Sequence, residues 1–351
     1  MSVEVLAIGD QFIPAAAYSA ALADRLDGAD LRIRTVDWAG TKSEQHAAQH
    51  RMELSGPGAV PMPPELAASV PGAAVLCVHF APVGAGLLRA ADSLRLVAVA
   101  RTGLENVDLA TATARGVGVV PVYGRNASAV AELQLGLMLS EARNIARADA
   151  SVKSGGWRKD FPGDRIEISG RTVGMVGFGH VGRHFAAKLS GFACRLLSYD
   201  PYTTDAALAE SGVERATALD EIFAESDFVV IQARHTPETE RFIGRKQLAL
   251  MKPGAYLVNV ARSRVVDTEA LYEVLADRRI AGAGLDVFDE EPLPVDSPWR
   301  SLDNTTFTTH FGGDTVDTNR VSAALVADAV VEFVRTGRCA TAVNAAQLGW
   351  A

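Results

Sequence analysis

Short apolar runs rich in Val, Ile and Leu alternate along the chain with longer stretches in which apolar residues recur at helical spacing. This alternation predicts parallel sheets whose strands are joined by crossover helices, so the expected fold class is α/β. Early strands are expected at residues 3–8, 31–36, 74–78, 94–98 and 117–120. Later strands are expected at residues 172–177, 193–199, 228–231, 255–260, 280–285 and 305–308.

Two helical segments indicate how the chain is divided. The stretch from Ala127 to about Val152 is apolar on more than one side, so we expect it to lie between two domains that both cover it. The segment from about Asp317 to Arg335 has no further strand after it, so we expect it to pack on the first domain. The predicted division is a discontinuous domain of residues 1–122 and 322–351, interrupted by a domain of residues 123–321.

Composition and charge narrow the class of partner. Hydrophobic residues make up 48% of the 351 residues and charged residues 22%, which fits a globular chain of two domains. The net charge of -8, without a basic stripe, argues against nucleic acid or membrane and favours a small molecule. The N-terminal run lacks a basic region and is interpreted as a strand rather than a signal peptide. Three scattered cysteines suit a reducing compartment, so the expected location is the cytoplasm.

A glycine-rich turn stands between an expected strand and an expected helix, and it reads Gly177-Phe178-Gly179-His180-Val181-Gly182. Small residues let the backbone approach a pyrophosphate, whose charge is met by amide groups at the helix N-terminus. The next strand ends at Asp200, about 20 residues on, where an acid binds the adenosine ribose of a dinucleotide. A carboxylate repels a 2′-phosphate, and residues 201–204 contain no Arg or Lys. NAD is therefore favoured over NADP.

Three polar residues follow later strands, at the sheet edge where ligands of open α/β folds bind. They are Arg262, Glu291 and His310. His310 can move a proton at a substrate oxygen, Glu291 can hold the other ring nitrogen, and Arg262 can clamp a carboxylate and polarise a carbonyl. This is the set of groups that the reduction of a 2-keto acid needs. The pair His46 and His50 lacks a third ligand, so no metal is expected.

The sequence resembles the D-isomer-specific 2-hydroxyacid dehydrogenases, the family of phosphoglycerate, glyoxylate and formate dehydrogenases. Besides the glycine turn and the three polar residues, the matching segments are Asn106-Val107-Asp108, Val130-Ala131-Glu132, Thr236-Pro237-Glu238-Thr239 and Met251-Lys252-Pro253-Gly254-Ala255. The resemblance implies a Rossmann-type doubly wound parallel sheet in residues 123–321, as the dinucleotide-binding domain. A smaller flavodoxin-like α/β domain would then bind the substrate. It also implies a homodimer.

The resemblance further implies roles for individual residues. Arg262, Glu291 and His310 would be catalytic, and Asp286 would lie near the nicotinamide carboxamide. The expected dinucleotide contacts are Gly177, Gly179, His180, Val181, Gly182, Asp200, Pro201, Arg234, Thr239, Val260, Ala261, Arg262, Asp286, His310 and Gly312. The expected substrate contacts are Val78, His79, Phe80, Arg101, Thr102, Gly103, Arg262 and His310.

Several positions depart from the commonest family pattern, and they leave the substrate open. Arg101 stands where Gly is common, and Arg234 stands where Pro is frequent. Two extra arginines indicate either a substrate with a second acidic or polyhydroxylated end, or arginines that are merely paired at the surface. Two other functions stay open. One is the oxidation of a small anion such as formate or phosphite, and the other is a corepressor-like module that senses NAD without turnover.

Overall fold

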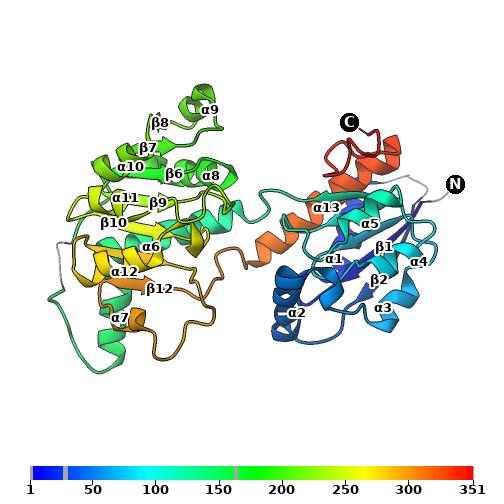
Figure 1. The fold of residues 1–351 in the computed structure, drawn as a ribbon, viewed down its shortest axis with the longest axis horizontal. Helices are drawn as coiled ribbons and strands as arrows, with labels where there is room; N and C mark the ends of the chain where they lie inside the picture. Colours follow the sequence, from blue (N-terminus) through cyan, green and yellow to red (C-terminus); the bar gives the residue numbers. More distant parts are fainter. Residues whose placement is uncertain (1–2, 27–30, 162–164, 351) are drawn as a thin grey trace. The chain divides into compact units, whose positions relative to one another are not determined.

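The computed structural model describes residues 3–26, 31–161 and 165–350. The chain forms two compact units, unit 1 from Met1–Arg125 and Thr315–Ala351 and unit 2 from Asn126–Asp314 (Figure 1). The chain thus leaves unit 1 after Arg125 and returns at Thr315, whereas the sequence placed these crossings after residues 122 and 321. The return comes earlier because the last long helix already begins at Val316, so its whole length belongs to unit 1.

Unit 1 is built on a five-stranded sheet in the order β2-β1-β3-β4-β5, with every neighbouring pair parallel. This is the flavodoxin-like strand order that was predicted. β3 to β5 are buried along their whole length, as their continuous apolar runs require in a sheet covered on both faces. The strands are β1 (Val3–Gly9), β2 (Leu31–Asp37), β3 (Val75–Val78), β4 (Leu96–Val99) and β5 (Gly118–Pro121).

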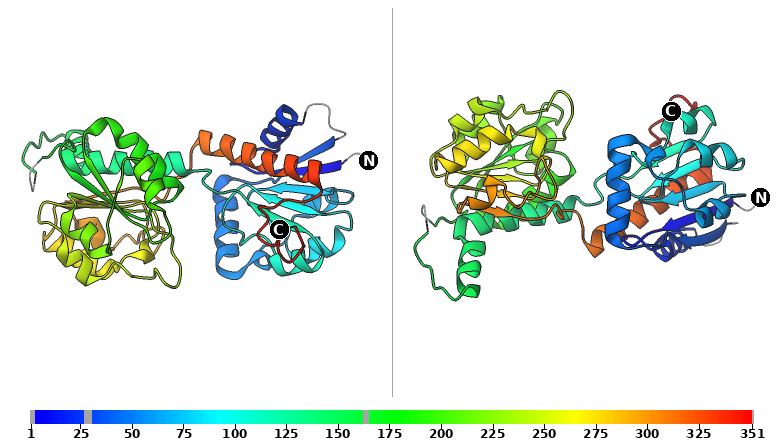
Figure 2. Two further views of the ribbon diagram at one scale, coloured as in Figure 1. Left: turned by 90° about the horizontal axis from the view of Figure 1, so that it is seen from above. Right: turned by 60° about the horizontal axis from the view of Figure 1, so that its bottom comes forward.

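Helices of unit 1 cover both faces of this sheet, and α1 and α13 pack together on one of them (Figure 2). The predicted return of the last helix to the first sheet is therefore confirmed. Thr315 caps the N-terminus of α13, and Gly337 ends it in the left-handed conformation that suits glycine. The helices are α1 (Ala15–Arg25), α2 (Lys42–Ser55), η1 (Pro57–Ala59), α3 (Pro64–Ser69), α4 (Ala85–Ala90), α5 (Leu109–Ala114) and α13 (Val316–Thr336).

Unit 2 is built on a seven-stranded parallel sheet in the order β12-β11-β10-β9-β6-β7-β8. The strand order reverses at β6, where the chain passes to β7 on one side and β9 on the other, as in a Rossmann-type doubly wound sheet. The predicted fold class is thus confirmed. The strands are β6 (Thr172–Val176), β7 (Arg195–Tyr199), β8 (Glu214–Arg215), β9 (Phe228–Ile231), β10 (Tyr256–Asn259), β11 (Gly282–Leu285) and β12 (Thr305–Phe307).

The helical stretch expected from Ala127 to about Val152 is confirmed, but the structure divides it into two helices. Asn144 adopts the left-handed conformation, with φ of 56°, and breaks the helix. Within unit 2, α6 packs on α8 and on β10, β11 and β12, which gives it cover on more than one side. The helices are α6 (Ala127–Arg143), α7 (Ile145–Lys153), α8 (His180–Leu189), η2 (Ser190–Phe192), α9 (Asp205–Glu210), α10 (Leu219–Glu225), α11 (Arg245–Leu250), η3 (Ser263–Val265), α12 (Thr268–Ala276) and η4 (Pro298–Ser301).

In the described part of the chain, no helix is both long and apolar enough to cross a membrane. The same residues contain no group of three or more His, Cys, Asp or Glu side chains that could hold a metal ion.

Candidate functional site

The glycine turn of unit 2 connects β6 to the N-terminus of α8, in the strand–turn–helix order that was expected. Gly177 has φ of +99°, and a Cβ there would stand 3.0 Å from the backbone nitrogen of Ala233, so only glycine fits. A Cβ on Gly182 would stand 2.9 Å from the ring of Phe178. A Cβ on Gly179 would meet no atom within 4 Å. Two of the glycines therefore serve close packing, whereas Gly179 borders open space.

Asp200 lies directly after β7 and is held against the glycine turn. One carboxylate oxygen accepts a hydrogen bond of 2.7 Å from the amide of Phe178, inside the turn. The other accepts hydrogen bonds from the amides of Tyr202 and Thr203, at 2.8 and 3.0 Å. The carboxylate is thereby fixed beside the turn, and an ionised carboxylate still has lone pairs to offer to ribose hydroxyls.

These features together fit a dinucleotide. No side chain caps the N-terminus of α8, so its first amides stay available to an anion. Gly179 leaves the space that a pyrophosphate needs beside these amides, and Asp200 provides the acceptor for a ribose. His180 and Val181 begin α8, and Pro201 follows Asp200 in the same turn region.

Arg215 of β8 is a cation near Asp200 that the sequence did not reveal. Its guanidinium donates to the carbonyl of Asp200 at 3.0 Å and to the carbonyl of Thr203, and it pairs with Asp205. Because these three groups already engage the guanidinium, Arg215 holds the turn after β7 together. A strand of two residues carries no readable pattern, which is why neither β8 nor Arg215 was anticipated.

A second group of residues follows β11 and β12, where Asp286 organises the loop that carries His310. Asp286 is buried and accepts hydrogen bonds from the hydroxyl of Thr308 at 2.5 Å and from the amides of Phe311 and Gly312 at 3.2 and 3.0 Å. These bonds surround His310, which adopts a left-handed φ of 57°. Such a conformation is unusual for a residue with a side chain and is retained where the surroundings enforce it.

Glu291 and His310 form the central pair of this group. Glu291 Oε2 lies 2.7 Å from His310 Nδ1, and Glu291 Oε1 accepts a hydrogen bond from the amide of Phe288 at 2.9 Å. Partial burial raises the pKa of Glu291, but the hydrogen bonds from His310 and Phe288 and the charge of Arg262 outweigh it and leave the pKa below its usual range. Glu291 is therefore an anion at neutral pH.

Arg262 follows β10, and its charge contributes to the low pKa of Glu291, so the structure brings the predicted three residues together in unit 2. The side chain of Asn259 fixes the turn beneath Arg262. It accepts from the amide of Ala261 and donates to the carbonyl of Arg262, both at 3.0 Å. The guanidinium is exposed and donates to the carbonyl of Ala261 at 2.7 Å. Its remaining donors can meet a carboxylate.

Other predicted dinucleotide contacts lie at the same edge of the sheet, after β9 and β10. The Thr239 hydroxyl donates to the carbonyl of Arg234 at 2.7 Å and closes the loop after β9, while the Arg234 side chain is exposed. Val260 packs beside Gly312, where a Cβ would stand 2.8 Å from a Val260 methyl group. The loop after β12 therefore depends on close packing against the end of β10.

The predicted substrate contacts lie in unit 1, after β3 and β4. Val78 ends β3, and His79 and Phe80 follow it with their rings stacked, at a centroid distance of 3.9 Å. The Thr102 hydroxyl donates to the carbonyl of Val122 at 3.0 Å. The Arg101 Nη2 atom lies 3.3 Å from a carboxylate oxygen of Glu53 and 3.4 Å from one of Glu105, and a Cβ on Gly103 would collide with Glu105. Arg101 is thus a paired arginine.

Two residues hold this region: Asp10, which was not singled out from the sequence, and Asn106, which belongs to one of the segments that match the family. Asp10, directly after β1, lies 3.0 Å from His79 Nδ1 and accepts from three backbone amides. The Asn106 amide donates to the carbonyls of His79 and Ala81, at 3.2 and 2.9 Å. A polar residue directly after a strand of a parallel sheet was the available signal for Asp10, since ligand sites form at that edge.

Comparisons with known proteins identify the family. Residues 135–312 match the family model described as D-isomer specific 2-hydroxyacid dehydrogenase, NAD binding domain. The chain is 41% identical over 268 residues to D-3-phosphoglycerate dehydrogenase of Mycobacterium leprae, covering 76% of this chain and 50% of that protein. It is 39% identical over 260 residues to hydroxypyruvate reductase of Thermotoga maritima, covering 73% of this chain and 83% of that protein.

Among solved structures, the TT0316 protein of Thermus thermophilus is similar, with a TM-score of 0.71 and 29% identity over 97% of this chain and 99% of that chain. The chain therefore belongs to the D-isomer specific 2-hydroxyacid dehydrogenase family, as its motifs predicted. It spans about half the length of the phosphoglycerate dehydrogenases that it matches. Unit 2 contains the family's NAD-binding domain, so the predicted nicotinamide dinucleotide cofactor is supported.

Proposed function

We propose that this protein is an NAD-dependent dehydrogenase that interconverts a D-2-hydroxy acid and its 2-keto acid, with His310 as the general acid and base. The observation that carries the proposal is the Glu291–His310 pair, 2.7 Å apart, in the NAD-binding unit, where the charge of Arg262 also lowers the pKa of Glu291. A charged clamp, a proton donor and an anion that orients the donor are the groups that this reaction requires.

The dinucleotide, when bound, exchanges a hydride with C2 of the substrate. In the direction of reduction His310 gives a proton to the carbonyl oxygen, so a hydride and a proton together convert the ketone to the alcohol. Nδ1 faces Glu291, which leaves Nε2 for the substrate oxygen. In oxidation the neutral imidazole takes the hydroxyl proton. Glu291 stays anionic throughout and stabilises the imidazolium that forms.

Arg262 binds the substrate carboxylate through paired guanidinium donors and polarises the neighbouring carbonyl. The planar guanidinium suits this two-pronged contact, which an ammonium cannot make. Within the proposal, unit 2 binds the dinucleotide through the glycine turn and Asp200, and unit 1 supplies substrate contacts from the ends of β3 and β4. The fixed Asp200 carboxylate and the engaged guanidinium of Arg215 both favour NAD, because neither offers a partner to a 2′-phosphate.

The carboxylate–imidazole pair also separates this proposal from the oxidation of formate. Formate loses only a hydride when it becomes carbon dioxide, so it has no hydroxyl proton for a His–Glu pair to remove. A hydroxy acid has one.

Initial rates of NADH oxidation with a panel of 2-keto acids test the proposal directly. We expect turnover with at least one 2-keto acid and slower turnover with NADPH. Formate and phosphite with NAD serve as the competing substrates. If dinucleotides bind but no 2-keto acid, formate or phosphite is turned over, the protein is a sensor; if only formate or phosphite reacts, it oxidises small anions.

We also propose that the protein works as a homodimer in the cytoplasm. The dimer follows from the family resemblance, and the location follows from the cysteine usage. Sedimentation of the purified protein at several concentrations tests the first statement, and fractionation of cells tests the second.

A further inference from the structure

Unit 1 contains buried polar atoms without hydrogen-bond partners, at the ends of β3 and β4 and on α2. Among the described residues these atoms include His79 Nε2, Arg101 Nη1 and Gln49 Oε1. Buried polar groups are nearly always paired, because an unpaired one costs about 1–3 kcal/mol. Three such atoms in one region therefore indicate a ligand that completes them.

The three atoms belong to one connected cluster, which we call the strand-end cluster: Gln49, Glu53, His79, Phe80 and Arg101. A Glu53 carboxylate oxygen lies 3.2 Å from Gln49 Nε2 and 3.3 Å from Arg101 Nη2, so it holds both side chains. The Arg101 guanidinium lies 5.4 Å from the centroid of the Phe80 ring, which stacks on His79. Glu53 is 44% exposed, so the cluster reaches solvent on that side.

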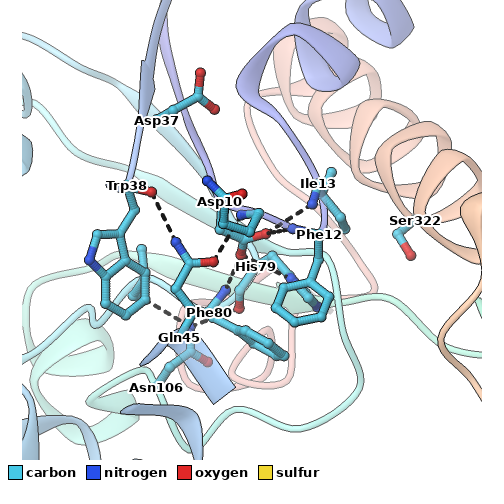
Figure 3. A network of polar contacts seen from close by, with 12 residues as sticks. Asp10, Phe12, Ile13, Asp37, Trp38, Gln45, His79, Phe80, Asn106 and Ser322 are labelled. Carbon is cyan, nitrogen blue, oxygen red and sulfur yellow. Dashed lines mark hydrogen bonds and ion pairs between the residues drawn. The ribbon is translucent and has the colours of Figure 1, made fainter. Parts of the chain in front are cut away.

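Asp10 determines what His79 can offer to a ligand. Figure 3 shows Asp10 between His79 and the backbone amides of Phe12 and Ile13. An ionised carboxylate only accepts hydrogen bonds, so His79 Nδ1 must be the donor across the 3.0 Å contact. Burial lowers the pKa of His79 more than the hydrogen bond to Asp10 raises it, so the ring is neutral near pH 7. Nε2 then carries a lone pair and can only accept.

The charges around Arg101 also limit which chemical group of a ligand can bind there. Its Nη2 atom lies within 3.4 Å of carboxylate oxygens from both Glu53 and Glu105. A phosphate or a second carboxylate at this place would face two anions, and the neutral His79 would offer it no proton. A hydroxyl group has no such conflict, since it can donate to His79 Nε2 or Gln49 Oε1 and accept from Arg101 Nη1.

We propose that the strand-end cluster binds hydroxyl groups on the carbon chain beyond C2, so the preferred substrate is a hydroxylated 2-keto acid and not a phosphorylated or dicarboxylic one. The identity of the ligand as a substrate rests on the proposed function. His79 and Gln49 accept from these hydroxyls, Arg101 donates to them, and Asp10 is a positioning residue that fixes the ring of His79.

Matched pairs of 2-keto acids test this specificity. The pairs are pyruvate with hydroxypyruvate, 2-ketobutyrate with 2-keto-4-hydroxybutyrate, and 2-ketohexanoate with 2-ketogluconate. We expect kcat/KM to favour the hydroxylated member of at least one pair by about tenfold or more, because a site built to pair with a hydroxyl rejects an analogue without it. Phosphohydroxypyruvate and oxaloacetate should be poorer substrates than hydroxypyruvate.

Two variants assign the preference to the cluster. His79→Asn keeps a donor toward Asp10 but has no group at the Nε2 position, so kcat/KM for the hydroxylated acid should fall about tenfold while that for its partner stays within about twofold. His184→Asn on α8 is the matched control, since that side chain is exposed and lies in unit 2, and it should leave the ratio of the two kcat/KM values unchanged. Glu53→Gln removes one of the anions beside Arg101 and should raise kcat/KM for phosphohydroxypyruvate several-fold.

A readout without turnover separates this inference from the proposed function. In protein labelled with ¹⁵N-histidine, a hydroxylated acid should shift the His79 Nε2 resonance, and its deoxy partner should not. If 2-keto acids are turned over but no pair is discriminated and the resonance does not move, the inference is overturned and the proposed function stands. If the resonance moves without any turnover, the proposed function fails and the hydroxyl site stands. If neither occurs, both are wrong.

Discussion

The two units each contain a carboxylate that faces the Nδ1 atom of a histidine, and the two pairs differ chiefly in burial. In unit 2 the distance from Glu291 to His310 is 2.7 Å, and the side chains are 36% and 43% exposed. In unit 1 the distance from Asp10 to His79 is 3.0 Å, and the side chains are 1% and 2% exposed. The same chemical pair thus stands in two different solvent environments.

Burial decides what each pair can do. Glu291 accepts one backbone amide besides His310, so its histidine can exchange protons with solvent and substrate. Asp10 accepts three backbone amides besides His79, and desolvation lowers the pKa of that ring. A histidine of the first kind can carry a proton in each catalytic cycle. A histidine of the second kind keeps one protonation state and serves as a fixed acceptor.

The largest expected effect follows from replacing the exposed histidine. His310→Ala should lower kcat by about 10²–10⁴-fold with every 2-keto acid and at every pH, because the proton donor itself is missing. His79→Asn should instead lower kcat/KM only for hydroxylated acids. Steady-state kinetics of both variants on the same substrate pair measure this contrast.

Binding of NADH, followed by its fluorescence, serves as the control for the folding of His310→Ala. The comparison between the pairs breaks down if His79→Asn costs as much as His310→Ala with every substrate. The buried pair would then take part in the proton transfer.

The free energy of unfolding should respond in the opposite way, with the larger loss for the buried pair of unit 1. Each oxygen of Asp10 receives two donors, so Asp10→Asn turns an NH₂ group toward donors in a buried site and should cost about 2–4 kcal/mol at pH 7. Glu291→Gln is partly exposed, where water can compensate, and should change the free energy of unfolding by less than about 0.5 kcal/mol. Urea unfolding of each variant and the wild type, followed by circular dichroism, measures both values.

The stability that the Asp10–His79 pair contributes should decrease as the pH falls. Burial raises the pKa of Asp10, but the hydrogen bonds from His79 and the backbone amides outweigh it and leave the pKa lowered. Its contribution is therefore present above its ordinary value of 3.8 and is lost as pH falls below it. The pKa of His79 is lowered as well, so stability also decreases as pH falls below its ordinary value of 6.5. An Asp10→Asn variant that matches the wild type at pH 7 would show that the pair is not a structural anchor.

The contrast between the pairs also shows what the sequence can reveal. The strands other than β8 were predictable from their apolar runs, and the glycine turn and the residues Arg262, Glu291 and His310 were predictable from their places after strands. The Asp10–His79 pair was not, because its members are 69 positions apart and meet only when β1 pairs with β3. That pairing is a property of the strand order.

Local backbone conformation was the other feature that could not be predicted from the sequence. The break at Asn144 depends on one residue with positive φ inside an otherwise helical pattern, and the left-handed φ of His310 depends on the bonds that Asp286 makes around it. The periodicity of apolar residues predicts neither conformation, because it indicates only which face of an element is buried.

Glu141 is another buried carboxylate, and its pKa is shifted in the direction opposite to that of Asp10. Glu141 of α6 pairs with Arg147 at 2.6 Å and accepts from the Thr306 hydroxyl, but burial outweighs these partners and raises its pKa to about 6. A raised pKa means that the fold favours the protonated form, so this contribution to stability is present below about 4.5 and is lost as pH rises through 6. Relative to Glu141→Gln, the wild type should lose about 1.5 kcal/mol between pH 4.5 and pH 6.5. Urea midpoints of both proteins over this range measure the difference, and parallel curves would contradict it.

The smallest expected effect concerns Asp200, a carboxylate that faces amides and no histidine. Its two oxygens accept from Phe178, Tyr202 and Thr203, so Asp200→Gly would remove the charge and also leave three amides unpaired. Asp200→Asn removes the charge but keeps one acceptor. Combined with Tyr202→Arg at a position that is 93% exposed, it should move the ratio of kcat/KM for NADPH over NADH upward by about tenfold or more.

Asp200→Asn alone and Tyr202→Arg alone separate the two contributions, since the first only removes a repulsion and the second only adds a phosphate partner. Each should give part of the shift, and kcat with NADH at saturation should stay close to the wild-type value, because neither residue touches the reacting atoms. A wild type that already prefers NADPH would show that Asp200 serves only to close the turn. The three amide hydrogen bonds would then be its whole role, and the engaged Arg215 would have to release its partners to meet the 2′-phosphate.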